Sequence, residues 1–365
     1  MMLDELIKDV QKSLFVSPRS ASQYILKKES LMEYVNTTVL SHPQIVHLIG
    51  GNTFSMVRDN HSNHWGFMAN VFQFNSYEML VRMVPWVYRT YRAHGFSFDY
   101  FPLELETWKQ AVGKFLDASS ADEIITVYDW MLRNHGKMIS LSEAPSDATD
   151  RYPRLAKDRK VFLSHLLAAD FRKCLSMANE ILQQENGQEL LYLGLIQPVM
   201  AEIGRLWEQD EISVAEEHLA TSVVGRILAG VYNQWPMPKQ PSRGKAVVTS
   251  APNEFHELGG RMLSDILEAD GWDVLFLGAN TPAVELMKIL RKTKPRFLAI
   301  SLTMPFNVDK VAAIIATVKE SADLSQTKII VGGPAFHWDA DLWRRIDADA
   351  WAEDPHAALK QVNQW

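Results

Sequence analysis

The chain of 365 residues has 47% hydrophobic and 22% charged residues, a globular composition that excludes a disordered or fibrous protein. Its formal net charge of −7 argues against a general binder of nucleic acids or anionic membranes, which would need excess positive charge. The single cysteine, Cys174, excludes an intramolecular disulfide and favours a reducing, cytoplasmic setting.

We expect neither a membrane-spanning helix nor a secretion signal. A membrane helix needs about 20 consecutive apolar residues, whereas the most apolar stretch, residues 190–207, is interrupted by Gln197, Pro198 and Glu202. The N-terminal segment mixes acidic, basic and apolar residues, and it lacks the basic head and apolar run of a secretion signal.

Residues 1–145 are expected to form an all-helical domain of about globin size. The spacing of apolar residues predicts helices over residues 3–14, 28–40, 66–93, 103–118 and 121–135. Residues 58–65 read instead as a polar loop with His61 and His64, which either binds haem, a bilin or a metal, or is a solvated turn. The region contains no cysteine, which excludes a thioether-linked bilin there.

A second domain is placed at residues 155–236, between a polar, proline-containing stretch at 142–147 and a proline-rich linker at 235–244. Its apolar residues recur at helical spacing, including a set formed by Leu163, Leu166, Leu167 and Phe171. This pattern predicts three or four antiparallel helices packed as a bundle.

One helix–helix turn of this bundle brings an indole close to two polar side chains. Trp207 ends one predicted helix, and Ser213 is the expected N-cap of the next, with Glu216 three residues later. Glu217 and His218 then lie one turn into that helix. These groups either face one cavity or are a core tryptophan beside a solvated Glu–His pair.

The third domain, residues 244–365, alternates predicted strands and helices. The strands are expected at residues 245–251, 272–278, 296–302 and 328–333. Regular alternation of this kind predicts a parallel sheet with helices on both faces, a doubly wound Rossmann-like fold. Ligands of such folds bind at the carboxyl ends of the strands, so the residues that follow each strand are the informative ones.

The loop after the first strand displays a histidine. His256 is a good ligand for a borderline metal, and Glu254 could accept the other ring N–H and fix the tautomer. Gly259 permits a close approach of the backbone. The alternative is a hydrogen-bonded loop histidine without a ligand.

Small residues follow other strands, where they would open a slot instead of filling it. Ser301 and Thr303 end the third strand and offer hydroxyl groups, and Gly332 and Gly333 end the fourth. Each of these loops is weak evidence for a ligand when taken alone.

Together, E-x-H-x-x-G, S-x-T and G-G resemble the signature of the cobalamin-binding domain. The resemblance implies that His256 binds cobalt from below, in the base-off, His-on mode. It implies a slot for the nucleotide tail of the cofactor, lined by Ser301, Thr303, Gly332 and Gly333, with Phe255 and Gly259 among the other contacts. The sequence departs from the family in having Glu254 where most members have aspartate.

The bundle adds the pattern W-x9-E-H upstream of this signature, which resembles the CarH-type light-sensing cobalamin proteins. The resemblance implies that Trp207 packs on the 5′-deoxyadenosyl group of adenosylcobalamin and that Glu217 and His218 bind this group. Light then breaks the cobalt–carbon bond and changes the domain arrangement and the oligomeric state. Glu208 stands where DNA-binding members have a histidine that captures cobalt after illumination; His218 is a candidate to replace it.

Residues 1–145 do not look like the basic helix-turn-helix domain of those members, so no direct DNA binding is expected. A helical N-terminal unit before a cobalamin module also resembles the photocobilins, which would add biliverdin as a second pigment, either held non-covalently or reaching Cys174 in the bundle.

The leading hypothesis is therefore a light sensor without catalytic activity, which forms a light-dependent homo-oligomer and acts on an effector that the sequence does not identify. One alternative is a corrinoid methyl-carrier protein of a methyltransferase system. Another is a haem or bilin sensor that keeps the corrinoid fold without using it.

Overall fold

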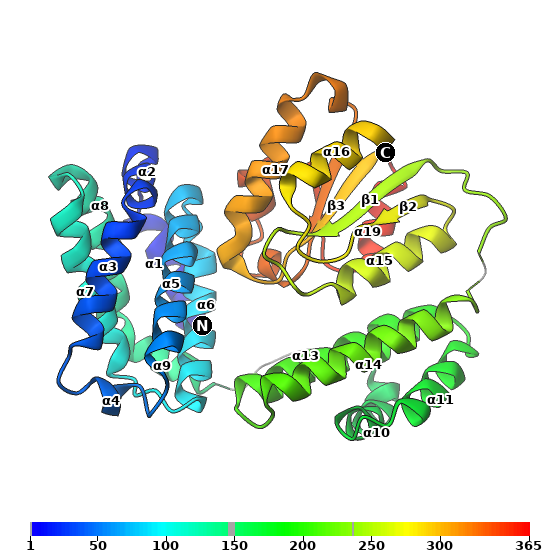
Figure 1. Ribbon diagram of the computed structural model, residues 1–365, viewed down its shortest axis with the longest axis horizontal. Coiled ribbons are helices and arrows are strands. Elements are labelled where there is room, and N and C mark those ends of the chain that lie inside the picture. The colour runs from blue at the N-terminus through cyan, green and yellow to red at the C-terminus, as the bar shows by residue number, and fades with distance from the viewer. Residues whose placement is uncertain (1, 145–149, 236) are drawn as a thin grey trace.

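The computed structural model describes residues 2–144, 150–235 and 237–365. Residues 145 and 236, the predicted ends of the first two domains, lie outside the described residues, as do parts of the boundaries predicted at 142–147 and 235–244. The division into residues 1–145, 155–236 and 244–365 stays a prediction. Figure 1 shows a group of N-terminal helices, an α/β unit and a second group of helices arranged around a common centre.

The N-terminal region is helical, as its apolar spacing predicts. Its helices are α1 (Met2–Ser13), α2 (Pro18–Leu26), α3 (Lys28–Leu40), α4 (Ile45–Leu48), α5 (Phe54–Phe74), α6 (Tyr77–Ala93), α7 (Tyr100–Phe115), α8 (Ala118–Arg133) and α9 (His135–Ser142).

Two details of the sequence prediction for this region are wrong. The expected polar loop at residues 58–65 lies inside α5, because its histidines point into the core and complete the apolar face of the helix. The single helix expected at 66–93 is divided into α5 and α6, because Asn75 has the left-handed φ of 47° and ends α5.

The middle region is a helical bundle with its own hydrophobic core. It consists of η1 (Pro153–Leu155), α10 (Ala156–Leu167), α11 (Phe171–Leu182), α12 (Gly187–Glu189), the π-helical stretch η2 (Leu190–Ile196), α13 (Gln197–Glu208) and α14 (Val214–Tyr232). The spacing of Phe171 from Leu163 and Leu166 suggested that the three residues share a helix. This is wrong, because Phe171 begins α11, whereas Leu163 and Leu166 belong to α10. The predicted capping box is present, with Ser213 and Glu216 at the start of α14.

The C-terminal region confirms the predicted Rossmann-like class. Its five strands are parallel and lie in the order β2-β1-β3-β4-β5. They are β1 (Lys245–Ser250), β2 (Asp273–Phe276), β3 (Phe297–Ser301), β4 (Lys328–Gly332) and β5 (Ala350–Ala352). The connecting helices are α15 (Leu258–Ala269), α16 (Ala283–Thr293), η3 (Pro305–Asn307), α17 (Val308–Glu320), η4 (Ala322–Leu324), η5 (Pro334–His337), α18 (Leu342–Arg345) and α19 (Pro355–Val362).

Alternate residues of β1 pack on opposite faces of the sheet. Val247 belongs to the core that α16 and α17 complete, whereas Ala246 and Val248 belong to the core beneath α15 and α19. Chain order reverses between β1 and β3, because β2 lies on one side of β1 and β3 on the other. The loops after β1 and β3 therefore diverge at the switch point where folds of this kind hold their ligands.

Within the described ranges 2–144, 150–235 and 237–365, we find no helix that combines the length and the apolar character needed to cross a bilayer.

Gly333, which follows β4, offers a test of this packing. It has a φ of 100°, and a Cβ atom there would lie 2.5 Å from the carbonyl oxygen of Leu302. We expect Gly333→Ala to lower the free energy of unfolding by roughly 1–3 kcal/mol through clash and backbone strain, measured by urea unfolding. The control is Gly136→Ala, because a Cβ on Gly136 meets no atom within 4 Å. Equal unfolding midpoints for the two variants would contradict the described backbone.

Candidate functional site

The loop after β1 holds His256 by its backbone. The hydroxyl of Ser250, the last residue of β1, donates to the carbonyl oxygen of His256 at 2.9 Å. Asn253 adopts a left-handed φ of 60°, and the amide of Glu254 then donates to the carbonyl oxygen of Ala251 at 3.0 Å. The chain therefore turns back at the strand end and presents the next side chains at the carboxyl edge of the sheet.

Glu254 and His256 form a close pair in this loop. Nδ1 of His256 lies 2.5 Å from Oε1 of Glu254, the hydrogen bond that the sequence predicted. A carboxylate only accepts hydrogen bonds, so Nδ1 carries the proton and the lone pair of a neutral ring is on Nε2. The Glu254 side chain is 1% exposed and that of His256 is 57% exposed. The imidazole is thus oriented from a buried side and leaves Nε2 available to a ligand.

The second oxygen of Glu254 is also fully used. Oε2 accepts hydrogen bonds from the backbone amides of Thr303 at 2.8 Å and Met304 at 2.9 Å. Thr303 was predicted to contribute its hydroxyl, whereas its amide is what this contact uses. The sequence did not reveal the role of Met304, because a backbone donor leaves no signal in residue type. The carboxylate therefore joins the loops after β1 and β3 across the switch point.

These contacts shift the pKa values of both partners. Burial alone would raise the pKa of Glu254, but the hydrogen bonds from His256 and from the Met304 amide hold it below its usual value. The hydrogen bond to Glu254 raises the pKa of His256, against the lowering effect of burial. The pairing therefore favours the charged form of each partner.

The other predicted residues of this unit lie near the same edge, with different exposure. Ser301 ends β3, and a Cβ placed on Gly259 would lie 3.8 Å from its hydroxyl oxygen. Gly332 ends β4 and pairs with Ser301, and Gly333 follows it, close to Leu302. The Phe255 side chain is 72% exposed.

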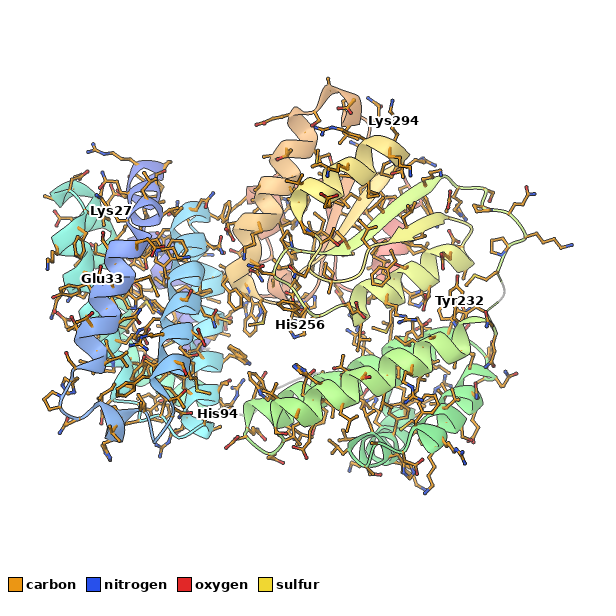
Figure 2. The ribbon with its side chains drawn as sticks, in the orientation of Figure 1. Lys27, Glu33, His94, Tyr232, His256 and Lys294 are labelled. Carbon is orange, nitrogen blue, oxygen red and sulfur yellow. The ribbon has the colours of Figure 1, made fainter. Side chains whose placement is uncertain are left out.

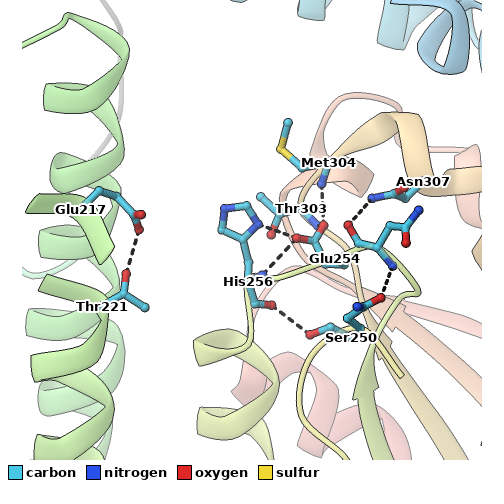
Figure 3. A network of polar contacts seen from close by, with 10 residues as sticks. Glu217, Thr221, Ser250, Glu254, His256, Thr303, Met304 and Asn307 are labelled. Atoms are coloured by element: carbon cyan, nitrogen blue, oxygen red, sulfur yellow. Dashed lines mark hydrogen bonds and ion pairs between the residues drawn. The ribbon is translucent and has the colours of Figure 1, made fainter. Parts of the chain in front are cut away.

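The bundle faces this loop through α14. Figure 3 shows Glu217 and Thr221 on α14 opposite His256, with the Glu217 carboxylate directed toward the loop. The Thr221 hydroxyl donates to Oε1 of Glu217 at 2.8 Å, and Nδ1 of His218 lies 2.5 Å from Oε2. His218 itself is 74% exposed.

Trp207 lies at the end of α13, half-buried, and packs against the bundle core. Its nearest aromatic neighbour outside the bundle is His94, with the ring centroids 5.7 Å apart. Figure 2 shows His94 and His256 on different parts of the chain, both beside the central space between the three groups of elements. The sequence did not single out His94, since nothing in its local pattern links it to the bundle.

The histidines of α5 do not fit a haem, bilin or metal site as they stand. Both ring nitrogens of His61 are engaged, by Asn36 Oδ1 at 2.7 Å and the Tyr100 hydroxyl at 2.9 Å. Burial lowers the pKa of His61 to about 4 and that of His64 to about 3, so both are neutral core residues. In the part of the chain that the structure describes, no group of three or more His, Cys, Asp or Glu residues is placed to hold a metal ion.

Two regions of the chain match family models described as B12 binding domain. One match covers residues 159–230, the bundle, and the other covers residues 244–360, the α/β unit.

Curated relatives fall into two groups. The chain is 26% identical to the HTH-type transcriptional repressor CarA of Myxococcus xanthus over 140 residues, which are 38% of this chain and 46% of the relative. It thus spans about half the length of CarA. It is 23% identical to dimethylamine corrinoid protein 3 of Methanosarcina acetivorans over 166 residues, 45% of this chain and 76% of the relative.

The fold is also similar to that of the monomethylamine corrinoid protein of Methanosarcina barkeri. The TM-score is 0.51 with 17% sequence identity, over 58% of this chain and 100% of that protein. At this identity the likeness shows the fold alone. By the family matches, residues 159–230 and 244–360 are a cobalamin-binding module, in which a helical bundle precedes a Rossmann-like B12 binding domain.

Proposed function

We propose that this protein is a light sensor that uses adenosylcobalamin, and that loss of the adenosyl group in light changes the arrangement of its domains and its self-association. The observation that carries the proposal is the pairing of His256 with a buried carboxylate at the switch point, opposite a helix that presents Glu217. The partial likeness to CarA supports the regulatory class.

The residues present fit a corrin. Nε2 of His256 has the free lone pair that cobalt requires, and Glu254 sets the direction of the ring. Ser301, Gly332 and Gly333 would line the groove for the nucleotide tail. When bound, adenosylcobalamin supplies a light-labile bond between cobalt and the adenosyl carbon.

The bundle side provides groups for the upper face. The Glu217 carboxylate is held by Thr221 and His218 and can accept hydrogen bonds from the hydroxyl groups of an adenosyl ribose. Trp207 offers an indole face large enough to cover that group. Loss of the adenosyl group removes these contacts and shifts the equilibrium between two arrangements of the bundle. The bundle is then a two-state element that the ligand biases.

A corrinoid methyl carrier is the second candidate, favoured by the likeness to dimethylamine corrinoid protein 3 over most of the length of that protein. A methyl carrier must open its upper face to a methyltransferase. Trp207 and Glu217 would obstruct that approach and suit a larger upper ligand. We do not extend the proposal to biliverdin, because His61 is buried, His64 is partly buried, and both are already hydrogen-bonded.

The deciding experiment is reconstitution in darkness with adenosylcobalamin, methylcobalamin, biliverdin and haemin in parallel, followed by green light. We expect selective binding of adenosylcobalamin, and a light-induced change in the absorption spectrum and in the size-exclusion profile. Unchanged spectra and profiles would refute the sensor. Preference for methylcobalamin with methyl transfer to a thiol would establish the carrier instead.

His256→Ala should abolish the base-off, His-on absorption spectrum, since no other ring nitrogen of the β1 loop can replace it. His47→Ala is the matched control, because His47 is exposed on α4. A His-on spectrum that survives in His256→Ala would show that another residue is the lower ligand.

Trp207→Ala should reduce the preference for adenosylcobalamin over methylcobalamin by roughly 10-fold, since a tryptophan contact at a binding surface is commonly worth that much or more. Trp207→Phe should retain part of the preference. Equilibrium titration followed by absorption measures both, and an unaltered preference in Trp207→Ala would remove the indole from the site.

Glu254→Gln should lower the pKa of His256 in the corrin-free protein, because the hydrogen bond to Glu254 is the main cause of its elevation.

The raised pKa of His256 means that the contribution of this residue to stability is full below pH 6.5, the ordinary value of its pKa, and is lost as pH rises through the pKa of the folded protein. The lowered pKa of Glu254 means that its contribution is lost as pH falls below 4.5 through the folded value.

NMR titration of the His256 ring measures this shift, with Glu217→Gln as the control, since Glu217 raises the same pKa through charge alone. A larger shift in the control than in Glu254→Gln would contradict the assigned pairing. In addition, Glu254→Gln should weaken corrin binding by about 10- to 100-fold, as loss of a partner that orients a metal ligand commonly does.

A further inference from the structure

The N-terminal helices are joined firmly to the α/β unit. α5 packs on η3, where the Asn70 side chain, 1% exposed, donates to the carbonyl oxygen of Pro305 at 3.1 Å. The Ser76 hydroxyl donates to the buried carboxylate of Asp339. One continuous hydrophobic core includes residues of both parts. Buried polar contacts within a shared core are costly to break, so these two parts form one body.

The bundle is attached to that body at one end. Near α15, the Tyr192 hydroxyl donates to Asp265 and the Tyr232 hydroxyl donates to Glu268, both at 2.6 Å. Met262 and Ile266 of α15 belong to the bundle core. This end of the bundle is therefore anchored, and Figure 1 shows the α13–α14 turn at the opposite end, beside the N-terminal helices.

The opposite end makes weaker contacts with the end of α6 and with His94, which follows that helix. Arg89 Nη2 lies 4.0 Å from Oε2 of Glu208, and His94 Nε2 lies 3.8 Å from Oδ1 of Asp210. The His94 ring tilts against Trp207 with centroids 5.7 Å apart. The His94 ring carries a charge only when it is protonated, and Asp210 is 62% exposed, so contacts at such distances contribute little to stability.

The orientation of the His94 ring does not depend on the bundle. Its Nδ1 donates to the carbonyl oxygen of Thr90, one turn earlier on α6, at 2.9 Å. The ring is thus fixed by its own helix, and its remaining nitrogen and its face are directed at the turn. The contact needs no rearrangement of α6 to form or to open.

We propose that Arg89 and His94 form a releasable clasp on the α13–α14 turn and act as positioning residues for Trp207. The proposal rests on the proposed function: the group above the corrin and the clasp hold the same indole from different sides. Loss of the upper group removes one of these two holds, so the turn opens more often, the bundle pivots about its anchor on α15, and the N-terminal helices stay fixed to the α/β unit.

The clasp is tested by hydrogen exchange on the full chain. Three amides of the turn, those of Gln209, Asp210 and Glu211, donate to backbone carbonyls of α13 and report its opening. In the corrin-free protein, His94→Ala combined with Arg89→Ala should raise their exchange rates by roughly 2- to 10-fold, as expected for loss of weak ion pairs and one ring contact. Exchange in Thr303 and Met304, on the firm side, should not change.

The matched control is Arg82→Ala, since Arg82 lies on the same helix and pairs with Glu78 of α6. Rates in the double variant equal to those of the control would overturn the clasp. This arm needs no corrin, so its result is independent of whether the proposed function holds.

A second arm tests the coupling to the site. In wild-type protein loaded with adenosylcobalamin, illumination should raise exchange in the turn from its dark level to about that of the corrin-free wild type, and the light-induced rise should be larger in the double variant, in which the clasp no longer holds the turn. If light leaves exchange in the loaded wild-type turn unchanged, the clasp does not respond to the upper face and the proposal fails. If adenosylcobalamin does not bind at all, the proposed function fails, and the corrin-free arm alone decides the contact.

Discussion

The site depends on one buried carboxylate, that of Glu254. A carboxylate removed from water must have its oxygens hydrogen-bonded or it is strongly destabilised. Glu254 meets this requirement with His256 on one oxygen and with the amides of Thr303 and Met304 on the other. The same contacts that satisfy the buried charge also direct the imidazole and connect the loops after β1 and β3.

That constraint extends into the N-terminal helices. The segment that supplies the two amides continues into η3, on which α5 packs. The lower side of the site is thus supported by three parts of the chain that are far apart in sequence. A rigid lower side suits the proposed ligand, because the position of the His256 ring, the proposed metal ligand, need not follow the proposed movement of the bundle.

The bundle, which faces the site from the other side, is held less firmly. The bundle has a core that includes two residues of α15, an anchor at α15 and a lightly held turn at its other end. Glu208 is informative in this setting. It stands at the position where the sequence resemblance predicted a histidine, and it lies near Arg89 of α6. The residue that departs from the family pattern is therefore part of a contact between the bundle and the N-terminal helices.

The secondary structure and burial of polar residues in the core were the features predicted least accurately from the sequence. Residues 58–65 read as a loop because they are polar, yet His61 and His64 are core residues of α5, with hydrogen-bond partners from α3, α7 and α8. Polarity predicts exposure only when no partner is available inside. Those partners lie on helices that are distant in sequence, so a local pattern could not show them.

Most elements, and the chemistry of single residues, could be predicted from the amino-acid sequence alone. Strand and helix periodicity identified the Rossmann-like unit and the bundle, and the spacing of Glu254 and His256 was sufficient to predict their hydrogen bond, because both belong to one short loop. Only the tertiary structure decided that backbone amides complete the Glu254 contacts, that α5 supports them and that His94 lies against Trp207. These contacts join residues separated by tens to hundreds of positions, and they use backbone groups or single side chains whose partners are defined only when the whole chain is packed.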